Sequence, residues 1–114
     1  MERSVDLFDF GHAIKLLKEG RLVAREGWNG KGMFIFMRPA DIINELCISC
    51  IKSLPEDFSE WVKSHPSESG KIKFGSFLCM KAADGTIVNG WLASQTDMLA
   101  DDWSEVDPYS NTNQ

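Results

Sequence analysis

The side chains best suited to chemistry lie in a polar block, residues 91–103, that begins and ends with tryptophan. Four consecutive members of this block can form hydrogen bonds: Ser94, Gln95, Thr96 and Asp97. They follow an expected strand, and polar groups are costly to bury without partners, so the block predicts either a helix start or a bound ligand. Ser94 and Asp97 have the S-x-x-D spacing of a capping box, although Glu or Gln is usual at the last position. Both interpretations stay open from the sequence.

A glycine-rich loop, residues 27–32, is the second segment of interest. Asn29 and Gly30 form a strong tight-turn signal, so a hairpin explains most of the loop. A hairpin does not need Trp28, however, and three glycines within six residues let a ligand approach backbone N–H groups, with Lys31 near to meet an anion. The spacing is neither that of a Walker loop nor that of a dinucleotide motif. Phosphate binding is therefore an alternative to the plain hairpin.

Together the two segments could bind a nucleotide. Aromatic planes from Trp28, Phe34 and Trp91 suit the flat faces of bases, and short polar side chains suit base edges and ribose hydroxyls. The opposing interpretation is that both tryptophans belong to the core or to a subunit interface. We predict nine ligand-binding residues: Trp28, Asn29, Lys31, Phe34, Trp91, Ser94, Gln95, Thr96 and Asp97.

Catalytic and metal-binding patterns are weak in this sequence. A hydrolytic site needs a nucleophile with a base, paired carboxylates or a metal cluster, and both histidines lie in contexts that favour a structural role. Asp101 and Asp102 are more typical of solvated charges than of an acid and base pair. Cys47 and Cys50 form a C-x-x-C motif without a second pair to complete a zinc site, and they are expected to be small apolar residues on a helical face. We therefore expect no catalytic residue, no metal and no cofactor.

The composition predicts one cytoplasmic domain of 114 residues. A formal charge of −5 argues against binding DNA or RNA through phosphate contacts, which require clustered lysine and arginine. Acidic residues interrupt the N-terminus, which does not resemble a secretory signal, and no apolar run reaches the roughly 18 to 20 residues needed to span a membrane. Neither a nucleic acid nor a membrane is an expected partner.

The fold class predicted from periodicity and turn signals is α+β. An antiparallel sheet is expected to carry an N-terminal helix, a helical insert between strands and a short helix near the C-terminus. In the insert, Asp41 is expected to cap a helix that starts with Ile42, and Ser53 and Glu56 bracket Pro55 at the first turn of a second helix. The expected boundaries are a helix at 10–19, strands at 21–26, 33–37, 71–82, 86–91 and 102–106, an insert at 39–73 and a disordered tail at 107–114.

Two stretches of the sequence resemble a known family. The run from Val23 to Phe34, which contains Gly27-Trp28-Asn29-Gly30-Lys31-Gly32, and the run from Asp84 to Trp103 closely resemble a small phage and prophage family that was long labelled a domain of unknown function. This family contains the second type of Thoeris anti-defence protein. The likeness covers roughly residues 8–38 and 76–106, and the insert at 39–73 departs from the shorter connection of typical members.

The resemblance implies a homotetrameric sponge that acts in the host cytoplasm during phage infection. Such proteins bind and sequester cyclic nucleotide immune signals, above all glycocyclic ADP-ribose and in some members cyclic dinucleotides, without degrading them. Two alternatives remain: a hydrolase of the same nucleotides, motivated by the acidic residues near Trp103, and a protein-interaction inhibitor of a host defence protein, motivated by the acidic surface and the tryptophan content.

Overall fold

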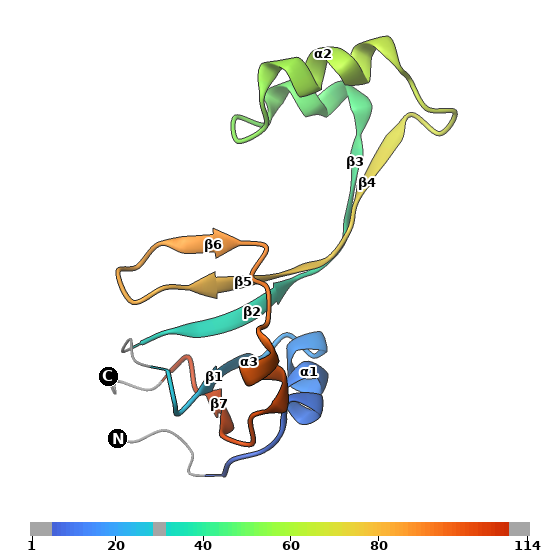
Figure 1. Cartoon of the computed structure of the whole chain (residues 1–114). Coiled ribbons are helices and arrows are strands. Elements are labelled where there is room, and N and C mark those ends of the chain that lie inside the picture. The colour runs from blue at the N-terminus through green and yellow to red at the C-terminus, as the bar shows by residue number, and fades with distance from the viewer. Residues whose placement is uncertain (1–5, 29–31, 110–114) are drawn as a thin grey trace. The chain divides into compact units, whose positions relative to one another are not determined.

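A five-stranded antiparallel sheet forms the first of two units in the chain, with strand order β6-β5-β2-β1-β7 (Figure 1). The computed structural model describes residues 6–28 and 32–109, and the first unit comprises Met1–Arg38 and Phe77–Gln114. With its helices, the sheet confirms the predicted α+β class. The elements of this unit are α1 (Phe10–Lys18), β1 (Leu22–Arg25), β2 (Phe34–Arg38), β5 (Phe77–Lys81), β6 (Ile87–Asn89), α3 (Gln95–Leu99) and β7 (Trp103–Val106).

Local signals account for the helix α1 and for two hairpins. Asp9 caps α1, because its carboxylate accepts a hydrogen bond of 2.9 Å from the backbone N–H of His12. Strands β1 and β2 pair as the predicted hairpin, with Val23 opposite Ile35. Strands β5 and β6 form the second hairpin, in which Gly85 takes a φ of +91° that a side chain would strain.

The core of this unit lies between α1 and one face of the sheet. Its five buried members are at most 1% exposed: Ala13, Leu17, Val23, Ile35 and Trp103. Full burial of a valine, leucine or isoleucine side chain stabilises a fold by about 1.5–3 kcal/mol. Because the ring of Trp103 lies in this core, the polar block that ends with it is anchored at its C-terminal end.

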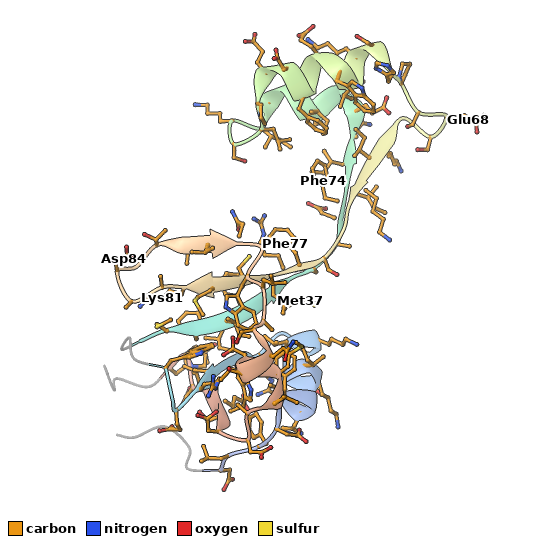
Figure 2. All side chains as sticks on the ribbon, in the orientation of Figure 1. Met37, Glu68, Phe74, Phe77, Lys81 and Asp84 are labelled. Atoms are coloured by element: carbon orange, nitrogen blue, oxygen red, sulfur yellow. The ribbon has the colours of Figure 1, made fainter. Side chains whose placement is uncertain are left out.

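The second unit comprises Pro39–Ser76 and combines a two-stranded antiparallel sheet with two helices (Figure 1). Ile48 of η1 and Val62 of α2 are buried. The ring centroid of Phe74, which Figure 2 labels on β4, lies 6.4 Å from that of Phe58. The elements of this unit are β3 (Asp41–Asn44), the 3₁₀ helix η1 (Glu45–Cys50), α2 (Glu56–Ser64) and β4 (Lys71–Phe74).

The predicted helix that starts with Ile42 is wrong. This segment is strand β3, in which Ile43 lies opposite Ile72, and the helix that follows is a 3₁₀ helix capped by Asn44 rather than by Asp41. β-branched isoleucines favour an extended backbone, and the pairing strand β4 supplies a partner that the local pattern does not reveal. Cys47 and Cys50 are exposed, not packed on a helical face.

The remaining differences concern boundaries. Helix α2 confirms the second predicted helix, but Pro55 occupies its N-cap position, without a side-chain capping bond, instead of its first turn. The predicted strand at 71–82 is two strands, β4 and β5, which belong to different sheets. No helix among the described residues is long and apolar enough to cross a membrane. Of the predicted tail, residues 110–114 lie outside the described part of the chain.

Candidate functional site

Three tryptophan rings cluster at the side of the sheet that holds the core. The buried ring of Trp103 is the centre, with Trp28 at 5.3 Å and Trp91 at 6.4 Å between ring centroids. Trp28 and Trp91 are half-buried and meet each other edge to face at 6.2 Å. Such edge-to-face pairs are worth about 0.5–1.5 kcal/mol beyond the area that they bury. The fold therefore brings together the two tryptophans that the sequence predicted for the site.

The carboxylate of Asp97 holds this cluster in place. One oxygen accepts hydrogen bonds from Nη1 of Arg25 at 2.8 Å and from the ring N–H of Trp28 at 3.3 Å. The backbone carbonyl of Asp97 accepts a bond of 3.0 Å from the ring N–H of Trp103. Asp97 thus links helix α3 to strand β1 and orients two of the three rings.

Ser94 and Asp97 form the predicted capping box at the start of α3. The hydroxyl of Ser94 accepts from the backbone N–H of Asp97 at 3.0 Å, and the second carboxylate oxygen of Asp97 accepts from the backbone N–H of Ser94 at 3.1 Å. This confirms the helix-start interpretation for these two residues. Gln95 and Thr96 are exposed on the first turn of α3 and take no part in the capping box.

Arg25 belongs to this cluster, although it is not among the nine residues predicted for the site. Its guanidinium bridges Asp97 and Asp102, with Nε of Arg25 2.8 Å from Oδ1 of Asp102, and its side chain is only 14% exposed. The other oxygen of Asp102 accepts from the backbone N–H of Gly27 at 2.8 Å, which fixes the start of the loop that carries Trp28. An arginine as buried as this one usually has a charged partner, but the sequence shows neither its burial nor which carboxylate it meets.

The two carboxylates are held in their charged form. The hydrogen bond from Arg25 is the largest cause that lowers the pKa of Asp102, and the backbone N–H of Gly27 adds to it. Burial raises the pKa of Asp97, but hydrogen bonds from Arg25, Ser94 and Trp28 outweigh it, so the pKa of Asp97 is also lowered. Asp102, followed by Asp97, raises the pKa of Arg25, which stays protonated.

These lowered pKa values predict acid sensitivity. A carboxyl group whose pKa is lower in the folded than in the unfolded state stabilises the fold above its unfolded pKa of about 3.9, and this contribution is lost as the pH falls through the folded pKa. The free energy of unfolding, measured by chemical denaturation between pH 7 and pH 2, should therefore drop below about pH 4. The drop should be smaller in Asp102→Asn and unchanged in Asp101→Asn, whose carboxyl is exposed. The same dependence of unfolding free energy on pH in the wild type, Asp102→Asn and Asp101→Asn would contradict this prediction.

Gly27 packs against the ion pair so closely that a side chain would disturb it. A Cβ at this position would lie 2.9 Å from Oδ2 of Asp102 and 3.2 Å from Nη2 of Arg25. We expect Gly27→Ala to lower the free energy of unfolding by about 1–3 kcal/mol, as steric overpacking does. Gly75→Ala is the matched control in the second unit, because a Cβ there meets nothing within 4 Å. Thermal unfolding of both variants checks this, and equal effects would argue against the close packing.

Of the predicted residues in and after the glycine-rich loop, the structure places Phe34, which lies away from this cluster. Phe34 lies opposite Lys81 and alternates along β2 with the buried Ile35, so its side chain is on the opposite sheet face from the tryptophans. Asn29 and Lys31 lie outside the described residues. The last loop residue that the structure describes, Gly32, is tied to β5, because Nζ of Lys81 donates to its carbonyl at 3.1 Å.

The arrangement suits binding through flat rings and short polar groups. Within residues 6–28 and 32–109, no three His, Cys, Asp or Glu side chains gather where they could hold a metal ion. The carboxylates of Asp97 and Asp102 are engaged with Arg25, so their contribution to the site is to orient Trp28 and the loop start.

Comparison with known proteins gives a consistent result. The model of a family described as the Thoeris anti-defense 2-like domain, Tad2-like, matches residues 8–106, a range that includes the second unit. The chain is also similar to a curated protein of Bacillus phage SP01 named Thoeris anti-defense 2. The two are 38% identical over 97 residues, which cover 85% of this chain and 92% of the phage protein.

Proposed function

This chain belongs to the Thoeris anti-defense 2-like family, and on that premise we propose that it is a sponge for cyclic nucleotide immune signals. The family name supports a role in phage anti-defence. We propose further that the protein binds glycocyclic ADP-ribose, cyclic dinucleotides or both in the host cytoplasm and keeps them from the host effector without degrading them.

The observation that carries this proposal is the pair of half-buried rings of Trp28 and Trp91, 6.2 Å apart beside the first turn of α3. A base can stack on such rings, and aromatic stacking is worth about 1–3 kcal/mol per base. The exposed side chains of Gln95 and Thr96 can then reach the base edge or a ribose hydroxyl. Asp97 and Ser94, which are engaged in the capping box and the ion network, act as positioning residues.

The same network favours sequestration over hydrolysis. The carboxylates that motivated a hydrolase are Asp97, Asp101 and Asp102, and two of them, Asp97 and Asp102, are ion-paired with Arg25. Lowered pKa values make them weak proton acceptors and leave them charged, so neither suits general acid or base catalysis near neutral pH. We therefore propose a non-catalytic protein that releases its ligand intact.

Sequestration also sets conditions on affinity and assembly. The dissociation constant must lie well below the signal concentration, and nanomolar binding corresponds to about −12 kcal/mol. A site shared between subunits can bury most of a small ligand, and we propose a homotetramer that provides such sites. Leu92 and Leu99 flank the candidate site at 88% and 79% exposure, and contact between subunits would remove them from water.

Titration calorimetry with glycocyclic ADP-ribose and with cyclic dinucleotides tests this function. The bound ligand is then recovered by denaturing the protein and is analysed by chromatography. Tight binding with intact ligand supports a sponge. Absence of heat with every ligand would refute it, and a new product after long incubation would instead establish a hydrolase.

The exposed leucines also favour one competing function. Leu92 and Leu99 could contact a host defence protein directly, which would make the chain a protein-interaction inhibitor. Pull-down from host lysate in the absence of nucleotide separates the two functions. A host protein that is retained by the wild type and lost in Leu92→Ser, with no nucleotide binding in calorimetry, would favour the inhibitor.

A further inference from the structure

The cysteine pair of the second unit is placed for metal binding. Cys47 and Cys50 are both exposed and both belong to the 3₁₀ helix η1. A 3₁₀ helix has 3.0 residues per turn, so side chains three positions apart are eclipsed on one face. The two thiols therefore point from the same side of η1 into solvent.

The helix geometry favours a shared metal ion over a disulfide. A rise of about 2.0 Å per residue separates eclipsed Cβ atoms by about 6 Å, whereas a disulfide needs about 3.5–4.5 Å between them. Zinc binds thiolates at about 2.3 Å in a tetrahedron, which places two sulfurs about 3.8 Å apart and leaves the Cβ atoms free to be farther from each other. A soft divalent ion can thus join the pair without unwinding η1.

The helix that presents the thiols is fixed at its start. The side chain of Asn44 accepts from the backbone N–H of Leu46 at 2.8 Å, and the backbone N–H of Glu45 donates to the carbonyl of Gly70 at 2.9 Å. The carboxylate of Glu45 accepts from the backbone N–H of Ser67 at 2.8 Å. These bonds tie the start of η1, directly before Cys47, to the loop that precedes β4.

We propose that Cys47 and Cys50 form half of a structural Zn²⁺ site, which the same pair of a second copy completes. Structural zinc sites are four-coordinate, and Cys₄ is a common ligand set. Two C-x-x-C pairs related by a two-fold axis through the ion supply four thiolates, and binding releases the thiol protons. Leu46, next to Cys47, is 86% exposed, and a second copy at this point would remove it from water. The inference does not rest on the proposed function, because no residue of the tryptophan cluster takes part.

Metal content and X-ray absorption of the reduced full-length protein test this site. After anaerobic incubation with Zn²⁺ and gel filtration, we expect one zinc per two chains and a first shell of four sulfurs at about 2.3 Å. Cys47→Ser and Cys50→Ser should each lose the metal. Cys79→Ala should keep it, because Cys79 is buried in the first unit.

Several results would overturn the proposal. These are zinc that does not survive gel filtration, one zinc per chain with two sulfurs and lighter ligands, or metal retention by the serine variants. A Cys47–Cys50 disulfide after mild oxidation, combined with no zinc uptake by the reduced protein, would show a redox pair instead. The absorption measurement on the wild type decides the ligand set even if a variant folds poorly.

Discussion

Asp97→Ala is expected to lower the free energy of unfolding by about 3 kcal/mol, because it removes three interactions at once. Arg25, whose side chain is 14% exposed, loses one of its two carboxylate partners, and Trp28 loses the acceptor of its ring N–H. Helix α3 loses the carboxylate half of its capping box, while Ser94 still accepts from the backbone N–H of residue 97. A helix cap alone contributes about 1 kcal/mol, and the broken ion pair supplies the larger share. Chemical denaturation at pH 7 measures the effect.

Asp101→Ala is the matched control for this variant. Asp101 is an exposed carboxylate in the same segment, and its removal should change the free energy of unfolding by less than about 0.5 kcal/mol. A similar loss in both variants would mean that net charge, and not the Arg25 network, sets the stability. Asp97→Asn keeps the shape of the side chain but removes its charge. A loss of unfolding free energy between those of the wild type and Asp97→Ala would separate the contribution of the ion pair from that of the helix cap.

Trp28→Ala is expected to weaken binding of the nucleotide signal by about 10- to 100-fold, the range that corresponds to the loss of one stacked ring. Trp28→Phe should lose less, because phenylalanine keeps an aromatic face and gives up only the 3.3 Å bond to Asp97. Titration calorimetry with glycocyclic ADP-ribose measures both variants, and unfolding curves ensure that only folded protein is compared.

Trp61→Ala provides the control for a lost tryptophan. Trp61 lies in α2 of the second unit, is 53% exposed, and stacks on His65 at 4.6 Å between ring centroids. Its removal should leave nucleotide affinity unchanged. If Trp61→Ala weakens binding as much as Trp28→Ala, the tryptophan cluster is not the centre of the ligand site.

The tryptophan cluster changes how the polar block between Trp91 and Trp103 is understood. In the sequence, the block has four adjacent side chains that could bind a ligand. In the fold, Ser94 and Asp97 are hydrogen-bonded to each other, and Asp97 also accepts from Arg25. Under the proposed function, the groups left for a ligand are the half-buried rings of Trp28 and Trp91 and the exposed side chains of Gln95 and Thr96. The first turn of α3 therefore alternates between residues held by hydrogen bonds, Ser94 and Asp97, and residues exposed to solvent, Gln95 and Thr96.

What the sequence determined by itself is mainly local structure. The cap at Asp9, the turn at Gly85 and the capping box at Ser94 each depend on residues within a few positions, whose hydrogen-bonding and φ preferences are properties of the residue types. The α+β class could also be predicted from the sequence, because hairpin turns and amphipathic periodicity are local signals. The likeness to the anti-defence family rested on the same contiguous runs.

The tertiary structure alone decided the partners that come from distant parts of the chain. Arg25 meets Asp97 and Asp102 across 72 and 77 positions, and no local pattern selects these carboxylates among the many in the sequence. Strand β3 exists because β4 pairs with it, although its sequence also suits a helix. Phe34 is separated from the tryptophans by the sheet, because strand register determines which face each side chain occupies. Long-range pairing set all three outcomes, and its free energy depends on the complete fold.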